Sequence, residues 1–195
     1  CTAPNGNTAD ETYDDLIVVG FSQVGAESDW RNANTRSMQQ ALSAENGFRL
    51  IIDDAQQKKE RQITAIRNFI HQGVDYIVLA PTTEDGWDTV LAEAKAAGIP
   101  VIIIDRMIDS SLATGDTGDQ HFTSWIGSDF QRQGDAAVQW LEKQFGEQPL
   151  RIIHLQGNYG SSAQVGRTTS LEKGLDRNPH WTLVARDSGD FTQAK

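Results

Sequence analysis

The chain has 195 residues, of which 38% are hydrophobic, so it can bury the core of one ordinary domain or of two small ones. Its formal net charge is −10, and it has no cluster of Lys and Arg of the kind that phosphate neutralisation requires. The composition therefore excludes nucleic acids and anionic membrane surfaces as partners. No run of about 18 apolar residues predicts a membrane-spanning helix.

The N-terminal segment is typical of a tethered protein. Cys1 is the only cysteine, and a sole cysteine in first position is characteristic of a bacterial lipoprotein after signal removal. Residues 1–15 are acidic and polar, as expected for a flexible tether. We predict lipid attachment at Cys1, and hence an extracytoplasmic protein, anchored to the bacterial cell membrane or periplasmic. The alternative is that the sequence simply begins at this residue.

Short apolar, β-branched runs predict strands that are buried on both faces. They lie at residues 16–22, 48–54, 76–80, 101–105, 124–128, 151–157 and 183–188. Segments with helical periodicity lie between most of them, with predicted apolar faces in 58–71 (Ile63, Ile66, Ile70), 86–97 (Val90, Leu91, Ala94) and 130–145 (Ala137, Trp140, Leu141). Glycines in residues 72–75 and 97–100 mark the expected helix ends.

This alternation of strands and helices predicts an α/β fold, with parallel sheets flanked by helices in a Rossmann-like, doubly wound arrangement. The pattern loosens in the polar stretch 110–124, which is either a surface insertion or a crossing between two lobes. We place a boundary near residue 128, which gives a tether (1–15), an N-terminal lobe (16–128) and the start of a C-terminal lobe (129–195). The second lobe is expected to be incomplete, because the pattern stops in mid-repeat.

Ligands of open parallel sheets bind at the carboxyl ends of the strands, and several charged side chains are expected there. Asp105 and Arg106 follow the fourth strand. A carboxylate accepts hydroxyl hydrogens and a guanidinium donates to two neighbouring oxygens, so the pair suits a vicinal diol of a sugar. The alternative is a local ion pair at the strand end.

The loop after the first strand offers a second group of candidate ligand contacts. Trp30 presents a flat apolar face for the C–H groups of a sugar, and Glu27 and Arg31 add polar contacts. Trp30 could instead belong to the core. Arg167 follows the Gly- and Ser-rich stretch 157–166, which we expect to be a turn, and either reaches the cleft from the second lobe or is solvated.

Signals for catalysis or for a metal are weak. The four histidines are scattered without ligand spacing, so no metal site is predicted. The sequence contains no G-x-G-x-x-G after the first strand, no Walker motif and no G-x-S-x-G. No pair of carboxylates can be assigned a glycosidase spacing. These absences disfavour a nucleotide-dependent enzyme, and we predict no cofactor and no catalytic residue.

Several motifs give a family resemblance. The segments S-Q-V-G-x-E-S-x-W-R from Ser22, Q-Q-K-x-E from Gln56 and G-W-x-x-V-L from Gly86, with IGSDF (126–130) and LQGNYGSSAQVGR (155–167), resemble the periplasmic sugar-binding proteins of ABC importers. Within that ribose- and galactose-binding family, the chain is most similar to the galactofuranose-binding branch. The resemblance implies two lobes joined by a hinge, which close on a monosaccharide, and it implies binding without enzymatic activity.

Carried onto this sequence, the resemblance also implies the ligand contacts. They are Ser22, Glu27, Trp30, Arg31, Asp105, Arg106 and Arg167, with Asp129 as a weaker candidate. The implied partners are a monosaccharide, either a galactofuranose-like sugar or another pentose or hexose, and an ABC transporter permease, and the implied state is a monomer. Two alternatives remain: a sugar sensor that signals to a membrane receptor or kinase, and a carbohydrate-processing enzyme.

Overall fold

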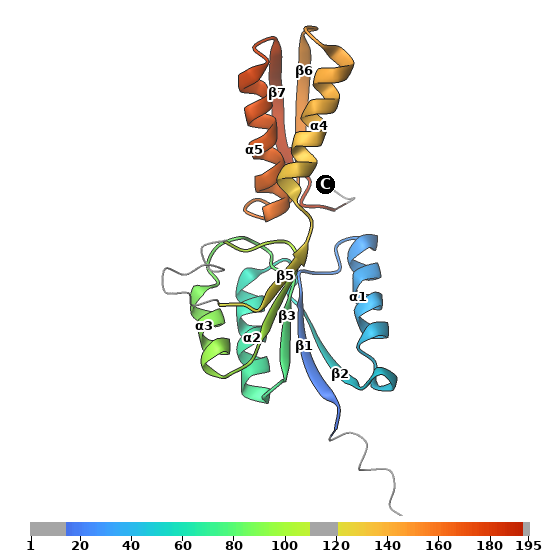
Figure 1. Cartoon of the computed structure of the whole chain (residues 1–195), viewed down its shortest axis with the longest axis vertical. Helices are drawn as coiled ribbons and strands as arrows, with labels where there is room; N and C mark the ends of the chain where they lie inside the picture. The colour runs from blue at the N-terminus through green and yellow to red at the C-terminus, as the bar shows by residue number, and fades with distance from the viewer. Residues whose placement is uncertain (1–14, 110–120, 193–195) are drawn as a thin grey trace, which may run out of the picture.

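The computed structural model describes residues 15–109 and 121–192. Lipid attachment at Cys1 and nearly all of the predicted tether lie outside the described residues, as does most of the polar stretch that follows residue 109. The described residues form two parts, each with its own parallel sheet (Figure 1). We call them the five-stranded part and the two-stranded part.

The five-stranded part contains β1 (Ile17–Gln23), β2 (Phe48–Asp54), β3 (Tyr76–Leu79), β4 (Val101–Asp105) and β5 (Ser124–Gly127). The strand order is β2-β1-β3-β4-β5, and every neighbouring pair is parallel. All of the carboxyl ends therefore lie at one edge of the sheet. The predicted α/β fold with a parallel sheet flanked by helices is confirmed.

Helices cover both faces of this sheet, as Figure 1 shows. They are α1 (Asp29–Ala41), α2 (Lys59–Gln72) and α3 (Asp88–Ala96), with a short 3₁₀ helix η1 (Ala44–Asn46) before β2. The α1 helix begins because the Ser28 side chain accepts a hydrogen bond from the amide of Arg31. The α2 helix ends at Gly73, whose φ of +62° is a left-handed conformation that favours glycine.

Alternation along the strands divides the core between the two faces. Phe21 and Val78 pack on the α1 side, and Ile77 and Leu79 pack with α2 and α3 on the other side. The predicted α3 face of Val90, Leu91 and Ala94 is fully buried. On α2 the fully buried residues are Gln62, Ala65, Ile66 and Phe69, so the predicted Ile63 and Ile70 lie at the margin of the buried face.

The two-stranded part contains α4 (Phe130–Phe145), β6 (Leu150–Gln156), α5 (Ser162–Arg177) and β7 (Trp181–Ser188). The helices α4 and α5 pack closely at two glycines. A Cβ atom on Gly134 would lie 2.7 Å from the Cβ of Ser170, and one on Gly174 would lie 2.8 Å from a Val138 methyl group, so the helices could not approach as closely with a side chain at either position. This packing corrects the predicted α4 face: Gly134 and Val138 are buried, and Trp140 is 56% exposed.

Two further sequence expectations differ from the structure. Exposed apolar side chains show that three strands are not buried on both faces as predicted: β5 (Ile126), β6 (Ile153 and Leu155) and β7 (Val184). Helix α5 begins at Ser162, inside the stretch that was predicted to be a turn up to residue 166, because Ser161 caps its first amides. The numerical limits of the lobes at residues 15 and 128 stay predictions.

Candidate functional site

A cavity of about 380 Å³ lies between the two parts, at the carboxyl ends of the five-stranded sheet. The five-stranded part contributes charged and aromatic side chains from the β1–α1 loop and from the end of β4. The two-stranded part contributes the first turns of α4 and α5 and the segment after β7. The lining residues are Glu27, Ser28, Trp30, Arg31, Asp105, Arg106, Ser128, Phe130, Gln133, Ala163, Arg167 and Phe191.

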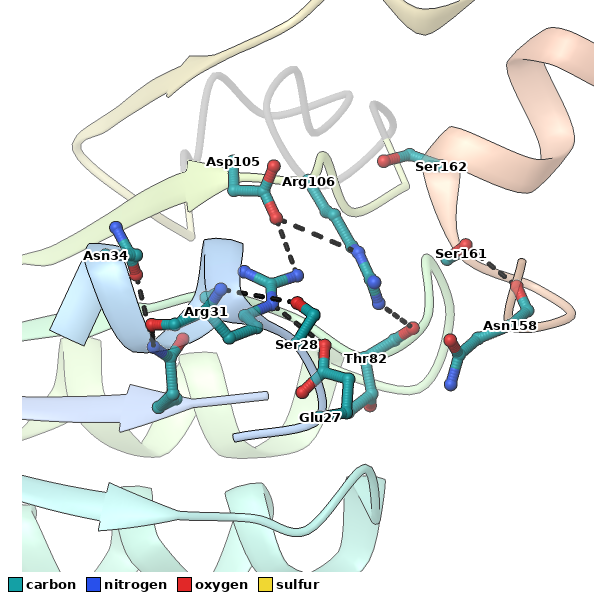
Figure 2. Close-up of polar contacts among 12 residues, drawn as sticks. Glu27, Ser28, Arg31, Asn34, Thr82, Asp105, Arg106, Asn158, Ser161 and Ser162 are labelled. Carbon is teal, nitrogen blue, oxygen red and sulfur yellow. Dashed lines mark hydrogen bonds and ion pairs between the residues drawn. The ribbon is translucent and has the colours of Figure 1, made fainter. Parts of the chain in front are cut away.

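Arg31 is the centre of the charge network in this cavity. It lies in the first turn of α1, its side chain is only 3% exposed, and its Nε donates to Glu27 Oε1 at 3.1 Å. Its Nη2 lies 2.8 Å from Asp105 Oδ2. Figure 2 shows the Asp105 carboxylate between the guanidinium groups of Arg31 and Arg106. One buried cation thus joins the β1–α1 loop to the end of β4.

The backbone of Asp105 is strained where it presents this carboxylate. Its φ is +62°, and the amide of Arg106 donates to the carbonyl of Ile104 at 2.7 Å, which closes a three-residue turn around a left-handed, non-glycine residue. Such conformations persist only where the surrounding structure imposes them, and they are concentrated at functional sites. Here the turn brings the side chains of Asp105 and Arg106 to the same edge of the sheet.

Arg106 is 4% exposed and is held by the neighbouring strand end. Its Nη1 donates to the carbonyl of Thr82 at 3.3 Å, and its Nε lies 3.8 Å from Asp105 Oδ2. Burial first, and then the positive charge of Arg31, lower the pKa of Arg106 to about 10, although Asp105 and Glu27 act in the opposite direction. The guanidinium is therefore still charged at neutral pH, with donors to offer.

Each of the three arginines in the cavity lies against an aromatic ring. The guanidinium carbons lie 4.8 Å from the Trp30 ring centroid for Arg31, 5.1 Å from that of Phe191 for Arg106, and 5.0 Å from that of Phe130 for Arg167. Arg167 also donates to Gln133 Oε1. These contacts hold the planar groups by cation–π attraction and give the cavity apolar surfaces beside its donors.

Hydrogen-bonding capacity remains in the network. Among the described residues, Glu27 Oε2 and Arg31 Nη1 are buried and have no hydrogen-bond partner within the protein. Buried polar atoms in proteins are nearly always satisfied, by the protein, by water or by a ligand, so this acceptor and this donor have capacity for an external partner. One atom accepts a hydrogen bond and the other donates one, which matches a hydroxyl group.

The structure brings together six of the eight ligand-contact residues predicted from the sequence. Glu27, Trp30, Arg31, Asp105, Arg106 and Arg167 all line the cavity. Ser22 does not, because it is fully buried within the sheet, between Asp53 of β2 and Leu79 of β3. Asp129 does not line it either, because its carboxylate caps α4 by accepting a hydrogen bond from the amide of Arg132 at 2.8 Å.

Sequence reasoning missed Phe130, Gln133 and Phe191. Phe130 and Gln133 are one helical turn apart, immediately after β5, and this spacing was a usable signal. No sequence signal pointed to Phe191. Its ring reaches the cavity because the backbone after β7 is left-handed at Asp190 and at Phe191 itself, with φ values of +49° and +59°. Within residues 15–109 and 121–192, no group of three or more His, Cys, Asp or Glu could hold a metal, and no helix is suited to cross a membrane.

Comparison with known proteins identifies the family. A model described as "Periplasmic binding protein domain" matches residues 19–195. The chain belongs to this family. This confirms the family predicted from the sequence motifs. A relative, the galactofuranose-binding protein YtfQ of Escherichia coli K12, supports the same family: it is 37% identical to this chain over 179 residues, which are 92% of this chain and 54% of the relative.

Other relatives extend the comparison. The fructose import binding protein FruE of Bifidobacterium longum is 33% identical over 77% of this chain and 45% of its own length. A Mycobacterium smegmatis structure in complex with β-D-fucofuranose is 43% identical, with a TM-score of 0.81 over 92% of this chain and 57% of that one. The binding protein of an arabinose ABC transporter from Shewanella, bound to L-arabinofuranose, is 40% identical, with a TM-score of 0.77 over 91% and 56%. The chain spans about half the length of these relatives.

Proposed function

We propose that this chain is part of an extracytoplasmic solute-binding protein that captures a monosaccharide between its two parts for an ABC importer. The observation that carries the proposal is the buried network of Glu27, Arg31, Asp105 and Arg106, which lines the cavity between the parts and keeps unused donors and acceptors. The relatives support the sugar class, because one that is 37% identical is named for galactofuranose and two structures that are 40% and 43% identical hold furanose sugars.

The chemistry of the cavity fits a cyclic sugar. The carboxylates of Glu27 and Asp105 accept hydroxyl hydrogens, and the guanidiniums of Arg31 and Arg106 donate to ring and hydroxyl oxygens. The rings of Trp30 and Phe191 offer faces for the C–H groups. A sugar that lacks one hydroxyl leaves a buried charged group without a partner, which costs about 1–3 kcal/mol.

The two parts act as lobes in this proposal. The ligand contacts both only when they are closed, so its binding energy shifts the population towards the closed form. The further proposed features are a permease as the partner, a lipid anchor on Cys1, a monomeric state and an absence of enzymatic activity. The sugar is returned unchanged.

The test is a thermal-shift titration with L-arabinose, D-galactose, D-fructose and D-ribose, followed by calorimetry. L-Arabinitol, which carries the hydroxyl groups of arabinose on an open chain, is the matched control. At least one sugar is expected to raise the melting temperature progressively with concentration, as mass action requires, and L-arabinitol is expected to have no effect. Chromatography of the recovered sugar tests for turnover. No shift with any sugar, or conversion of the sugar, would refute the proposal.

A further inference from the structure

Among the residues that the structure describes, three hydrogen bonds join the two parts outside the cavity. The side-chain amide of Asn158 donates to Gln57 Oε1, the backbone amide of Met107 donates to Ser162 Oγ at 2.9 Å, and the backbone amide of Glu84 donates to the carbonyl of Gly160 at 2.8 Å. None of these six residues lines the cavity. The bonds therefore connect the parts without using any group that is available to the ligand.

On the two-stranded part, all three bonds come from one turn, residues 158–162, which we call the latch turn. Ser161 holds this turn in shape: its hydroxyl donates to the carbonyl of Asn158 at 2.8 Å and accepts from the amide of Gln164 at 3.3 Å, which caps α5. Gly160 has a φ of +75°. Figure 2 shows Asn158, Ser161 and Ser162 at the start of α5, beside Thr82 and Arg106 of the other part.

On the five-stranded part, the groups that meet the latch turn are also held in place. Gln56 and Gln57 are consecutive left-handed residues, with φ values of +50° and +60°. The amide of Gln57 donates to the carbonyl of Val24 at 2.7 Å, and the amide of Ala55 donates to the carbonyl of Gln23. This strained loop is therefore fixed to the end of β1. Strain of this kind persists where the surrounding contacts impose it.

We propose that the latch turn holds the two parts together independently of sugar, and so sets the fraction of molecules in the closed form. This inference rests on the lobe closure of the proposed function. A protein–protein hydrogen bond replaces bonds to water, so its net contribution is small and both forms stay populated. The apparent dissociation constant is the intrinsic constant divided by the closed fraction. Residues that never contact the ligand thus adjust the affinity.

The test compares two buried serines of α5. Ser162→Ala removes the acceptor for the Met107 amide, which lies in the other part. The control, Ser170→Ala, removes a bond of similar length to the carbonyl of Gln131, which lies within the same part. The distance between the parts is measured by double electron–electron resonance in a Cys1→Ser background. The spin labels are placed on Glu60→Cys and Lys173→Cys, both at exposed positions.

Without added sugar, the unmodified protein and Ser170→Ala are expected to share one major short-distance population. Ser162→Ala should move molecules to longer distances and weaken L-arabinose binding about two- to tenfold, the range that one net hydrogen bond supplies. Asn158→Ala tests the Gln57 bond in the same way and is informative should Ser162→Ala fold poorly. Identical distance distributions in all four proteins would overturn the latch.

The resonance measurement also separates this inference from the proposed function, because it requires no ligand. A shift in the distances of Ser162→Ala without binding of any sugar would support the latch and refute the sugar-binding proposal. Sugar binding with unchanged distances in Ser162→Ala and Asn158→Ala would support the sugar-binding proposal and refute the latch.

Discussion

At the scale of single residues, the cavity depends on which charge is paired with which. Asp105 is shared by two guanidiniums, but Arg31 approaches it at 2.8 Å and Arg106 only at 3.8 Å. Loss of Arg31 would leave the buried carboxylates of Glu27 and Asp105 without their main partner, which is costly. Loss of Arg106 leaves that pairing intact. Arg106 is therefore the arginine whose contact with the ligand can be tested while the main pairing of Asp105 is kept.

Arg106→Ala is expected to abolish sugar binding that is measurable by calorimetry. Hydrogen bonds to a charged group contribute about 1.5–3 kcal/mol, and this guanidinium is placed to make them with the sugar. The melting temperature is measured alongside, because the variant loses the bond to the Thr82 carbonyl but keeps the Arg31–Asp105 pair. Arg67→Ala, which removes an exposed ion pair with Glu93, is the control and should bind normally. Unchanged affinity of Arg106→Ala would exclude its role in the site.

At the scale of elements, the approach of α2 to the sheet depends on a missing side chain. A Cβ atom on Gly20 of β1 would lie 2.5 Å from the ring of Phe69, which is buried on α2. No Cβ is tolerated at such a distance, so the helix or the ring would have to move. The close packing of α2 on β1 is thus encoded at one glycine of the strand.

Gly20→Ala is expected to destabilise the protein by about 1–3 kcal/mol through overpacking. Phe69→Leu alone should also destabilise it, since it leaves a small cavity. The double variant should be more stable than the sum of the two losses predicts, because the smaller side chain makes room for the added methyl group. Equilibrium unfolding in urea measures all three. Strictly additive losses would show that Gly20 and Phe69 do not compete for the same space.

The two-stranded part contains a histidine whose effect on stability can be tested by changing the pH. His154 lies in β6, and burial, followed by the charge of Arg186, lowers its pKa below 6.5, although Glu172 acts in the opposite direction. The unfolded chain therefore takes up the proton first as the pH falls. Stability from this group is present above pH 6.5 and is lost as the pH falls towards the folded-state pKa.

His154→Gln is accordingly expected to reduce the loss of stability between pH 7 and pH 5. The measurement is the midpoint of urea unfolding across that range. His71→Gln, at an exposed position of α2, controls for the loss of a histidine elsewhere in the chain. An unchanged slope for His154→Gln would contradict the assignment.

At the scale of the whole molecule, the candidate site belongs to neither part alone. The β1–α1 loop and the end of β4 supply the buried ion network, and α4, α5 and the segment after β7 supply Phe130, Arg167 and Phe191. The latch turn adds contacts between the parts away from the cavity. In the proposed function, affinity depends on the relative position of the parts, and it is expected to respond to changes that leave the cavity untouched.

The sequence by itself determined the strands, the parallel α/β architecture and most of the candidate site. Strand runs, helix periodicity and helix ends are local patterns, and the carboxyl ends of parallel strands converge without further information. For this reason Glu27, Trp30, Arg31, Asp105 and Arg106 could be grouped before any coordinates were known.

The tertiary structure alone decided the pairing and the packing. The close partner of Asp105 is Arg31 and not Arg106, which follows Asp105 in the chain. The left-handed turn at Asp105 directs its carboxylate towards α1. The buried face of α4 is formed by Gly134 and Val138, because α5 approaches closely only where side chains are small. Distances between segments that are far apart in the chain depend on how elements pack, and no local pattern contains that information.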